Sequence, residues 1–90
     1  MGRKSILLVS IRQLKAARAL LNWSQEQLAE ASGVSVPTIK RLEAQDGSLG
    51  GSEKTNERIL SSIHAAGIEF IDENGGGPGV RLRKHFESKR

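Results

Sequence analysis

The sequence predicts a mainly α-helical domain of four helices followed by a C-terminal β-hairpin. Three observations predict this fold class. A serine that can cap a helix, preceded by an apolar residue, recurs three times in the first half of the chain. Apolar residues follow helical spacing as far as residue 66 and then alternate with polar ones. The chain has 90 residues and no cysteine, so we expect one small domain without disulfides or thiolate metal sites.

The first helix is predicted at residues 11–21, where apolar side chains recur at helical spacing. Ser10 and Gln13 form a capping box, in which each side chain bonds a free backbone N–H at the helix start. Val9 precedes the cap and is expected to pack on the first turn as a hydrophobic staple. The helix is expected to end near Asn22.

The same pattern predicts two more helices, at residues 24–31 and 36–44. The apolar residues and serine caps that precede them are Trp23, Ser24, Val34 and Ser35. Gly33 separates the two helices and can take the left-handed conformation that ends a helix. Pro37 falls in the first turn of the second helix, where its missing N–H has no intrahelical partner to lose.

After residue 44 the chain is predicted to form a loop, a helix and a hairpin. Two glycine turns mark residues 45–51 as a loop, and residues 53–66 form a helix that Gly67 ends. Alternation then predicts strands at residues 68–72 and 80–83. The chain thus divides into an N-terminal arm at residues 1–10, a helical domain at 11–67, a β-hairpin at 68–84 and a basic tail at 85–90.

The charge is distributed unevenly, although the formal net charge is only +4. The first 18 residues carry five basic residues and no acidic one, and the last ten carry five basic residues against Glu87. The stretch between them carries four basic residues and nine acidic ones. The basic ends can therefore attract phosphate groups. Specific recognition of nucleic acid by the acidic stretch between them must depend on the placement of individual side chains.

No apolar run supports a membrane helix or an export signal. A membrane helix needs roughly 20 apolar residues, and an export signal roughly 7–15, whereas the run at Ile6–Val9 is shorter than either. We therefore expect a cytoplasmic protein without a membrane partner.

The segment Trp23–Glu43, WSQEQLAEASGVSVPTIKRLE, carries the functional signal. Two helices joined by a short turn approach closely, so they need a small side chain at the crossing, a glycine at the turn and branched aliphatic residues between them. Ala29, Gly33 and Ile39 meet these three requirements. This spacing is typical of a helix-turn-helix.

The same segment resembles the phage-repressor and Cro-like (XRE) helix-turn-helix family of bacterial and phage transcription regulators. The resemblance covers residues 11–67. The family-typical positions are held by Gln25, Ala29, Gly33, Val34, Ser35, Ile39 and Glu43. It implies that residues 11–67 are a compact lambda-repressor-like DNA-binding domain, which docks the helix at 36–44 in the DNA major groove. Family members more often close with a fifth helix, where this chain has a predicted hairpin.

Four residues of the helix at 36–44 are candidates for contacts with DNA bases. Val36, Pro37, Lys40 and Arg41 share one stripe of the helix, opposite the inward-facing Ile39. Lys and Arg side chains can donate to guanine O6 and N7, and apolar side chains can pack on a thymine methyl group. The alternative is an ordinary solvated face with two surface cations.

Other residues are candidates for contacts with the DNA backbone. The resemblance implies that Gln25 is a backbone clamp, at a helix start whose free N–H groups suit an anion. The further candidates are Ser35, Thr38, Gln45, Gly47, Ser48 and Lys54. Ser24 and Ser35 have an alternative role as helix caps alone.

The resemblance also implies a structural salt bridge between Arg18 and Glu43, since family members commonly pair an arginine of the first helix with this glutamate. Trp23 is interpreted as the hydrophobic staple of the second helix rather than as a platform for base stacking.

The hairpin has two possible roles. An isolated two-stranded hairpin is marginally stable in water, so its apolar face needs a cover. Either the hairpin closes the core of its own chain, or it joins two chains in a dimer to which residues 6–9 also contribute. The candidate dimer contacts are Ile68, Phe70, Val80 and Leu82.

No motif predicts an enzyme, a metal site or a cofactor. The glycine-rich run at 75–79 leads into a strand, whereas a phosphate-binding loop leads into a helix. His64 and His85 have no metal-ligand spacing, and neither Asp46 nor Asp72 is paired with a nucleophile.

The sequence therefore predicts a sequence-specific DNA-binding transcription regulator. We expect a repressor that binds an inverted repeat of double-stranded DNA as a homodimer, with half-sites about 34 Å apart. The alternative is a protein-binding module on the same fold, such as an antitoxin or an anti-activator. A third interpretation is non-specific binding of nucleic acid through the basic ends.

Overall fold

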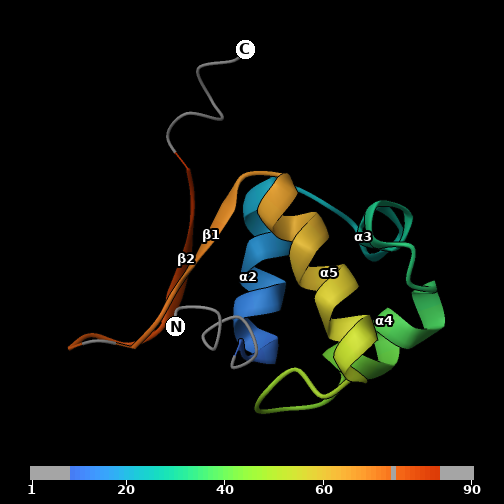
Figure 1. Ribbon diagram of the computed structural model, residues 1–90, viewed down its shortest axis with the longest axis horizontal. Helices are drawn as coiled ribbons and strands as arrows, with labels where there is room; N and C mark the ends of the chain where they lie inside the picture. Colours follow the sequence, from blue (N-terminus) through green and yellow to red (C-terminus); the bar gives the residue numbers. More distant parts are fainter. Residues whose placement is uncertain (1–8, 74, 84–90) are drawn as a thin grey trace.

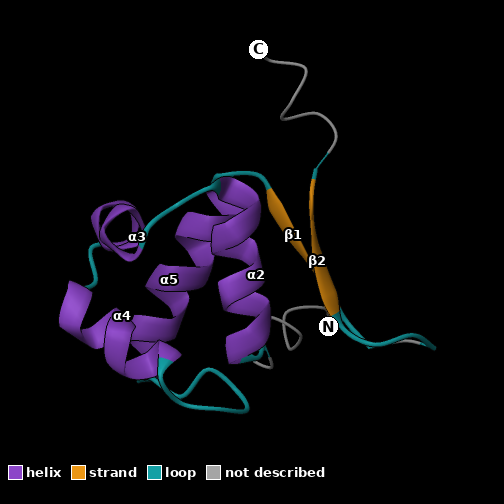
Figure 2. Cartoon of the chain, turned by 180° about the vertical axis from the view of Figure 1, so that it is seen from behind, coloured by secondary structure: helices purple, strands orange, loops and turns teal. Residues whose placement is uncertain are grey.

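The computed structural model describes residues 9–73 and 75–83. These residues form four helices and a two-stranded antiparallel sheet (Figures 1 and 2). The elements are α2 (Ile11–Leu21), α3 (Gln25–Ser32), α4 (Val36–Glu43), α5 (Glu53–Ala65), β1 (Ile68–Ile71) and β2 (Gly79–Leu82). The predicted fold class is confirmed. Most of the predicted N-terminal arm, at residues 1–8, and the basic tail at 85–90 lie outside the described residues.

The helices begin and end within one residue of the predicted positions. The helix predicted at 24–31 lies one residue later, because Ser24 keeps an extended backbone (φ −78°, ψ 171°) and acts only as the cap. Its hydroxyl accepts from the backbone N–H of Gln27, and Ser10 and Gln13 form the same capping box at the start of α2. Both boxes satisfy N–H groups that a helix start leaves unpaired.

Gly33 ends α3 and turns the chain toward α4. Its backbone is left-handed (φ 79°), and its N–H donates to the carbonyl of Ala29. A side chain in this conformation costs roughly 1–2 kcal/mol for most residue types, so the turn favours glycine. The chain resumes its helix three residues later, which brings α3 and α4 into contact.

The core is aliphatic and draws on all four helices. The buried apolar residues are Val9, Ile11, Leu14, Ala17, Leu28, Val34, Ile39, Leu42, Leu49, Ile59, Leu60, Ile63 and Ile68. α2 lies between the hairpin and α4, packing on both strands and on α4 (Figure 1). α5 packs on α3 and on the start of β1.

The hairpin closes the core of its own chain. Its register pairs Ile68 with Leu82 and Phe70 with Val80 on the face toward α2. Ile68 is fully buried within its own chain. Phe70, Val80 and Leu82 pack against the core and are half-buried.

Two long-range connections were absent from the sequence-based prediction. The first connection ties the start of the described chain to the loop that follows α4. The Leu49 N–H donates to the Val9 carbonyl at 2.9 Å, and the Ile11 N–H donates to the Gly47 carbonyl at 2.8 Å. Leu49, in the predicted loop, is buried in the core. The amide of Gln13 donates to the carbonyl of Gly79 at 3.0 Å, so the capping residue of α2 also holds the hairpin.

Candidate nucleic-acid interface

The helix α4 has one buried face and one outward face. Ile39 and Leu42 are buried against the other helices, whereas Pro37, Lys40 and Arg41 are exposed. Val36 is half-buried at the start of the helix. The structure thus places the four candidate base-contacting residues on the side of α4 that faces away from the core.

Ser35 and Thr38 hold the start of α4 together. The Ser35 hydroxyl accepts from the Thr38 backbone N–H at 3.3 Å and donates to the Thr38 hydroxyl at 3.0 Å. This is a cap, one of the two roles considered for Ser35. Ser35 is exposed and Thr38 half-exposed, so the cap lies at the surface beside Val36.

Glu43 lies at the centre of a polar cluster that joins α2, α3 and α4. The Arg18 guanidinium donates to both oxygens of Glu43, each at 2.8 Å, and also to the carbonyl of Trp23 at 2.9 Å. The amide of Gln25 donates to Glu43 Oε1 at 2.9 Å. The structure therefore brings Arg18 and Glu43 together in a two-bonded ion pair, with side chains only 19% and 4% exposed.

The cluster keeps Glu43 charged despite its burial. Burial by itself would raise the pKa of Glu43, but the hydrogen bonds from Arg18 and Gln25 and the positive charges of Arg18 and Lys15 outweigh it, and the pKa is lowered from 4.5. The bond to Glu43 raises the pKa of Arg18. Both groups are therefore ionised at neutral pH, and their pairing ties the end of α4 to α2.

Gln25 lies in the first turn of α3 and takes part in the polar cluster around Glu43. Its amide carries two N–H groups. One of them bonds Glu43, which sequence reasoning missed, because the two residues lie 18 positions apart. The second N–H can meet an anion at the surface, since Gln25 is only half-buried.

The other candidate phosphate-contacting residues follow α4 along the chain. Gln45, Gly47 and Ser48 are exposed in the loop, and Lys54 is exposed in the first turn of α5. An isolated bridge between Ser48 and Ser10 holds the loop against the start of α2. The loop backbone is thus fixed by its neighbours.

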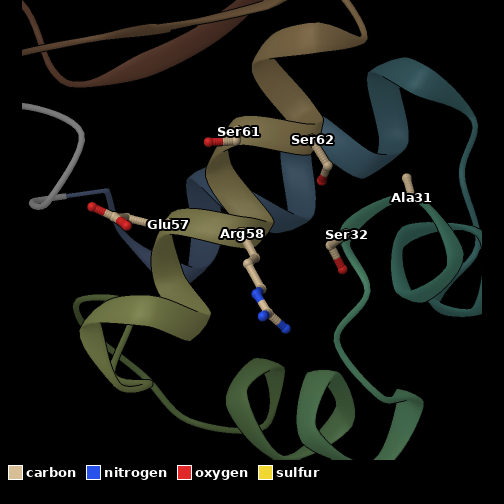
Figure 3. Close-up of a pocket in the computed structure, with 6 residues that line it drawn as sticks. All are labelled: Ala31, Ser32, Glu57, Arg58, Ser61 and Ser62. Atoms are coloured by element: carbon tan, nitrogen blue, oxygen red, sulfur yellow. The ribbon is translucent and has the colours of Figure 1, made fainter.

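A shallow hollow of about 410 Å³ lies between α3 and α5 (Figure 3). Its lining residues are Ala31, Ser32, Glu57, Arg58, Ser61 and Ser62. The Ser32 hydroxyl already accepts from the Val34 N–H, and the Ser62 hydroxyl donates to the carbonyl of Ile59. Both hydroxyls are therefore engaged by backbone groups of their own chain.

Residues 9–73 and 75–83 contain no cluster of three or more His, Asp or Glu side chains that could hold a metal ion. Among the same residues, no helix is both long enough and apolar enough to cross a membrane.

The arrangement of α3, the Gly33 turn and α4 defines a helix-turn-helix, with the second helix presenting an outward face that carries two cations. The helix-turn-helix family model matches residues 14–51, so this segment is similar to the Cro/C1-type (XRE) helix-turn-helix family. The family consists of DNA-binding transcription regulators. A comparison with curated proteins found no match to the chain.

Proposed function

We propose that this protein is a sequence-specific transcription regulator that binds an inverted-repeat operator as a homodimer and represses by occupying a promoter. The observation that carries the proposal is the two-sided character of α4. One face is buried and anchored through Glu43, and the other exposes Lys40 and Arg41. A helix held in this way can enter the major groove as a rigid unit and contact the base edges.

Four residues of α4 read the bases in this proposal. Arg41 donates to O6 and N7 of a guanine in a bidentate pair, and Lys40 donates to a neighbouring acceptor. Val36 and Pro37, at the start of the helix, pack on thymine methyl groups. The exposure of Pro37, Lys40 and Arg41 supports these roles.

The surrounding elements hold the DNA backbone. The second N–H of the Gln25 amide and the Lys54 ammonium group donate to phosphates on either side of α4. The further phosphate-contacting residues in this proposal are Ser35, Thr38, Gln45 and Ser48. These contacts set the position of α4 without reading sequence.

Two copies are needed because one short helix reads few base pairs. A two-fold dimer presents two α4 helices to half-sites one helical turn, about 34 Å, or a multiple of it apart. The protein then acts in the cytoplasm, associated with the nucleoid when it is bound to its operator.

Selection of bound sequences from random double-stranded DNA tests the proposal directly. The wild-type protein is expected to return an inverted repeat. Arg41→Ala is expected to weaken binding by about 1–3 kcal/mol, or roughly 5-fold to 150-fold, and to relax the preference at one base pair. Arg12→Ala is the matched control, because this exposed arginine lies on α2, outside both α4 and the hairpin.

The control variant is expected to keep the wild-type affinity and sequence preference. Equal affinity of the wild type for selected and random duplexes would reject sequence-specific reading. An equal loss for Arg41→Ala and Arg12→Ala would show that charge, rather than the placement of α4, determines binding.

A further inference from the structure

The strand β2 has an outer edge that points away from β1. The Arg83 N–H donates to the Gly67 carbonyl at 2.7 Å, and the register pairs Glu69 with Arg81. Residues 79, 81 and 83 therefore bond β1, and the N–H and C=O groups of Val80 and Leu82 point to the opposite edge. Within residues 9–73 and 75–83, no hydrogen bond reaches these groups.

Apolar side chains continue along this edge. Val80 and Leu82 pack against the core but stay half-exposed. Leu20 is 43% exposed, and it lies two helical turns from Gln13 on α2, on the stripe that contacts the hairpin. An edge strand with unpaired backbone groups and adjoining apolar surface is a site for the addition of another strand.

The position of the hairpin relative to α4 suits a two-fold partner. Strand addition about a two-fold axis perpendicular to the sheet leaves both helical bodies on the same face of the joined sheet. α2 lies between the hairpin and α4 (Figure 2), and the exposed residues of α4 lie opposite the buried face with which α4 packs on the other helices. Both copies of α4 would therefore emerge on one side, opposite the sheet, as a DNA duplex requires.

The charges favour the antiparallel orientation that the two-fold axis imposes. It places the tip of one hairpin, which carries Asp72 and Glu73, toward the base of the other, which carries Arg83. Arg81 faces its own copy at the axis, but each Arg81 donates to both oxygens of Glu69 in its own chain, at 3.1 and 3.3 Å. Like-charge repulsion at the axis is thereby reduced.

We infer that a second copy of this chain pairs antiparallel with the outer edge of β2, with Arg81 opposite Arg81, to form a continuous four-stranded sheet. Val80 then bonds Leu82 of the other copy, and the half-exposed apolar side chains of the two hairpins come together. The inference rests on the proposed homodimer and identifies the surface that forms it.

A single introduced cysteine tests this register, because the chain has none of its own. Arg81→Cys places two cysteines in a non-hydrogen-bonded antiparallel pair, where the Cα atoms lie about 4.5 Å apart, within reach of a disulfide. Glu69→Cys is the matched control, taken from the same ion pair and the same exposed face. Its two copies are separated by both β2 strands, or about 14 Å, which a disulfide cannot span.

Under mild oxidation, we expect Arg81→Cys to run as a covalent dimer on a non-reducing gel and Glu69→Cys to stay monomeric. Light scattering on the wild type is expected to give twice the mass of one chain. Cross-linking of both variants at the same rate, or of Glu69→Cys alone, would overturn the inference. So would a monomeric wild type.

DNA binding is measured separately, so the two proposals can fail independently. A wild type that is dimeric without cross-linking of Arg81→Cys would overturn the β2 interface and leave the proposed homodimer standing. Cross-linking of Arg81→Cys in a protein that binds no DNA would support the interface and reject the proposed function.

Discussion

The molecule contains two Arg–Glu pairs with the same chemistry in two different surroundings. Arg18 and Glu43 lie inside the helical part, with side chains 19% and 4% exposed. Arg81 and Glu69 lie on the outward face of the hairpin, with side chains 64% and 46% exposed. In each pair the guanidinium donates to both carboxylate oxygens.

The surroundings decide what each pair does. Glu43 also accepts from Gln25, and Arg18 also donates to the Trp23 carbonyl, so the inner pair connects α2, α3 and α4. The outer pair joins two neighbouring strands that are already hydrogen-bonded. Loss of one partner in the inner pair leaves a charge that water reaches poorly, whereas either partner in the outer pair is solvated without the other.

The largest expected effect comes from breaking the inner pair. Glu43→Ala leaves the Arg18 guanidinium without its carboxylate and is expected to lower the free energy of unfolding by about 3 kcal/mol. Urea unfolding followed by circular dichroism measures the change. Glu30→Ala, which removes an exposed glutamate of α3, is the control and is expected to leave the unfolding midpoint unchanged. Equal stability of the two variants would contradict the role of burial in the comparison.

A smaller effect is expected from acid. The folded-state pKa of Glu43 is lowered from 4.5, so in the interval between the two pKa values the unfolded chain binds more protons than the folded one. The stabilisation is complete above the unfolded value and is lost as the pH falls through the folded value. The stability difference between the wild type and Glu43→Gln should therefore shrink as the pH falls below the ordinary value of 4.5.

Urea unfolding of both proteins at several pH values measures this difference. If the stability difference between the two proteins stays constant across the acid range, the pKa of Glu43 is the same in the folded and unfolded states. If the stability difference grows on acidification, the pKa of Glu43 is raised by folding instead of lowered.

The helical half could be predicted from the sequence because its signals act over short distances. Ser10 and Gln13 lie three residues apart, and Gly33 specifies its turn by its own backbone freedom. The two cations of α4 share a face through helix geometry alone. Each of these inferences needs only neighbouring residues, and the structure has the helices within one residue of the predicted positions.

The rest depends on contacts between distant residues. Gln13 bonds Gly79, 66 positions away, and no local pattern distinguishes this glutamine from one that only caps a helix. Leu49 is a lone apolar residue in a glycine-rich loop, and its burial follows from the bond to Val9. An isolated leucine of this kind is the one signal that could have indicated that the loop is anchored.

The smallest expected effect comes from breaking the outer pair. Hydrogen bonds from Arg81 lower the pKa of Glu69, yet both side chains are solvated, and salt screens their attraction. At low protein concentration, where single chains dominate, Glu69→Ala is expected to leave the thermal midpoint unchanged. At high concentration the same change leaves the two Arg81 residues at the inferred two-fold axis without their carboxylate partners, so that they repel each other. Self-association should then be weaker, and sedimentation measures the difference. A midpoint that falls equally at both concentrations would show that the outer pair stabilises the single chain, and the contrast with Arg18–Glu43 would then be wrong.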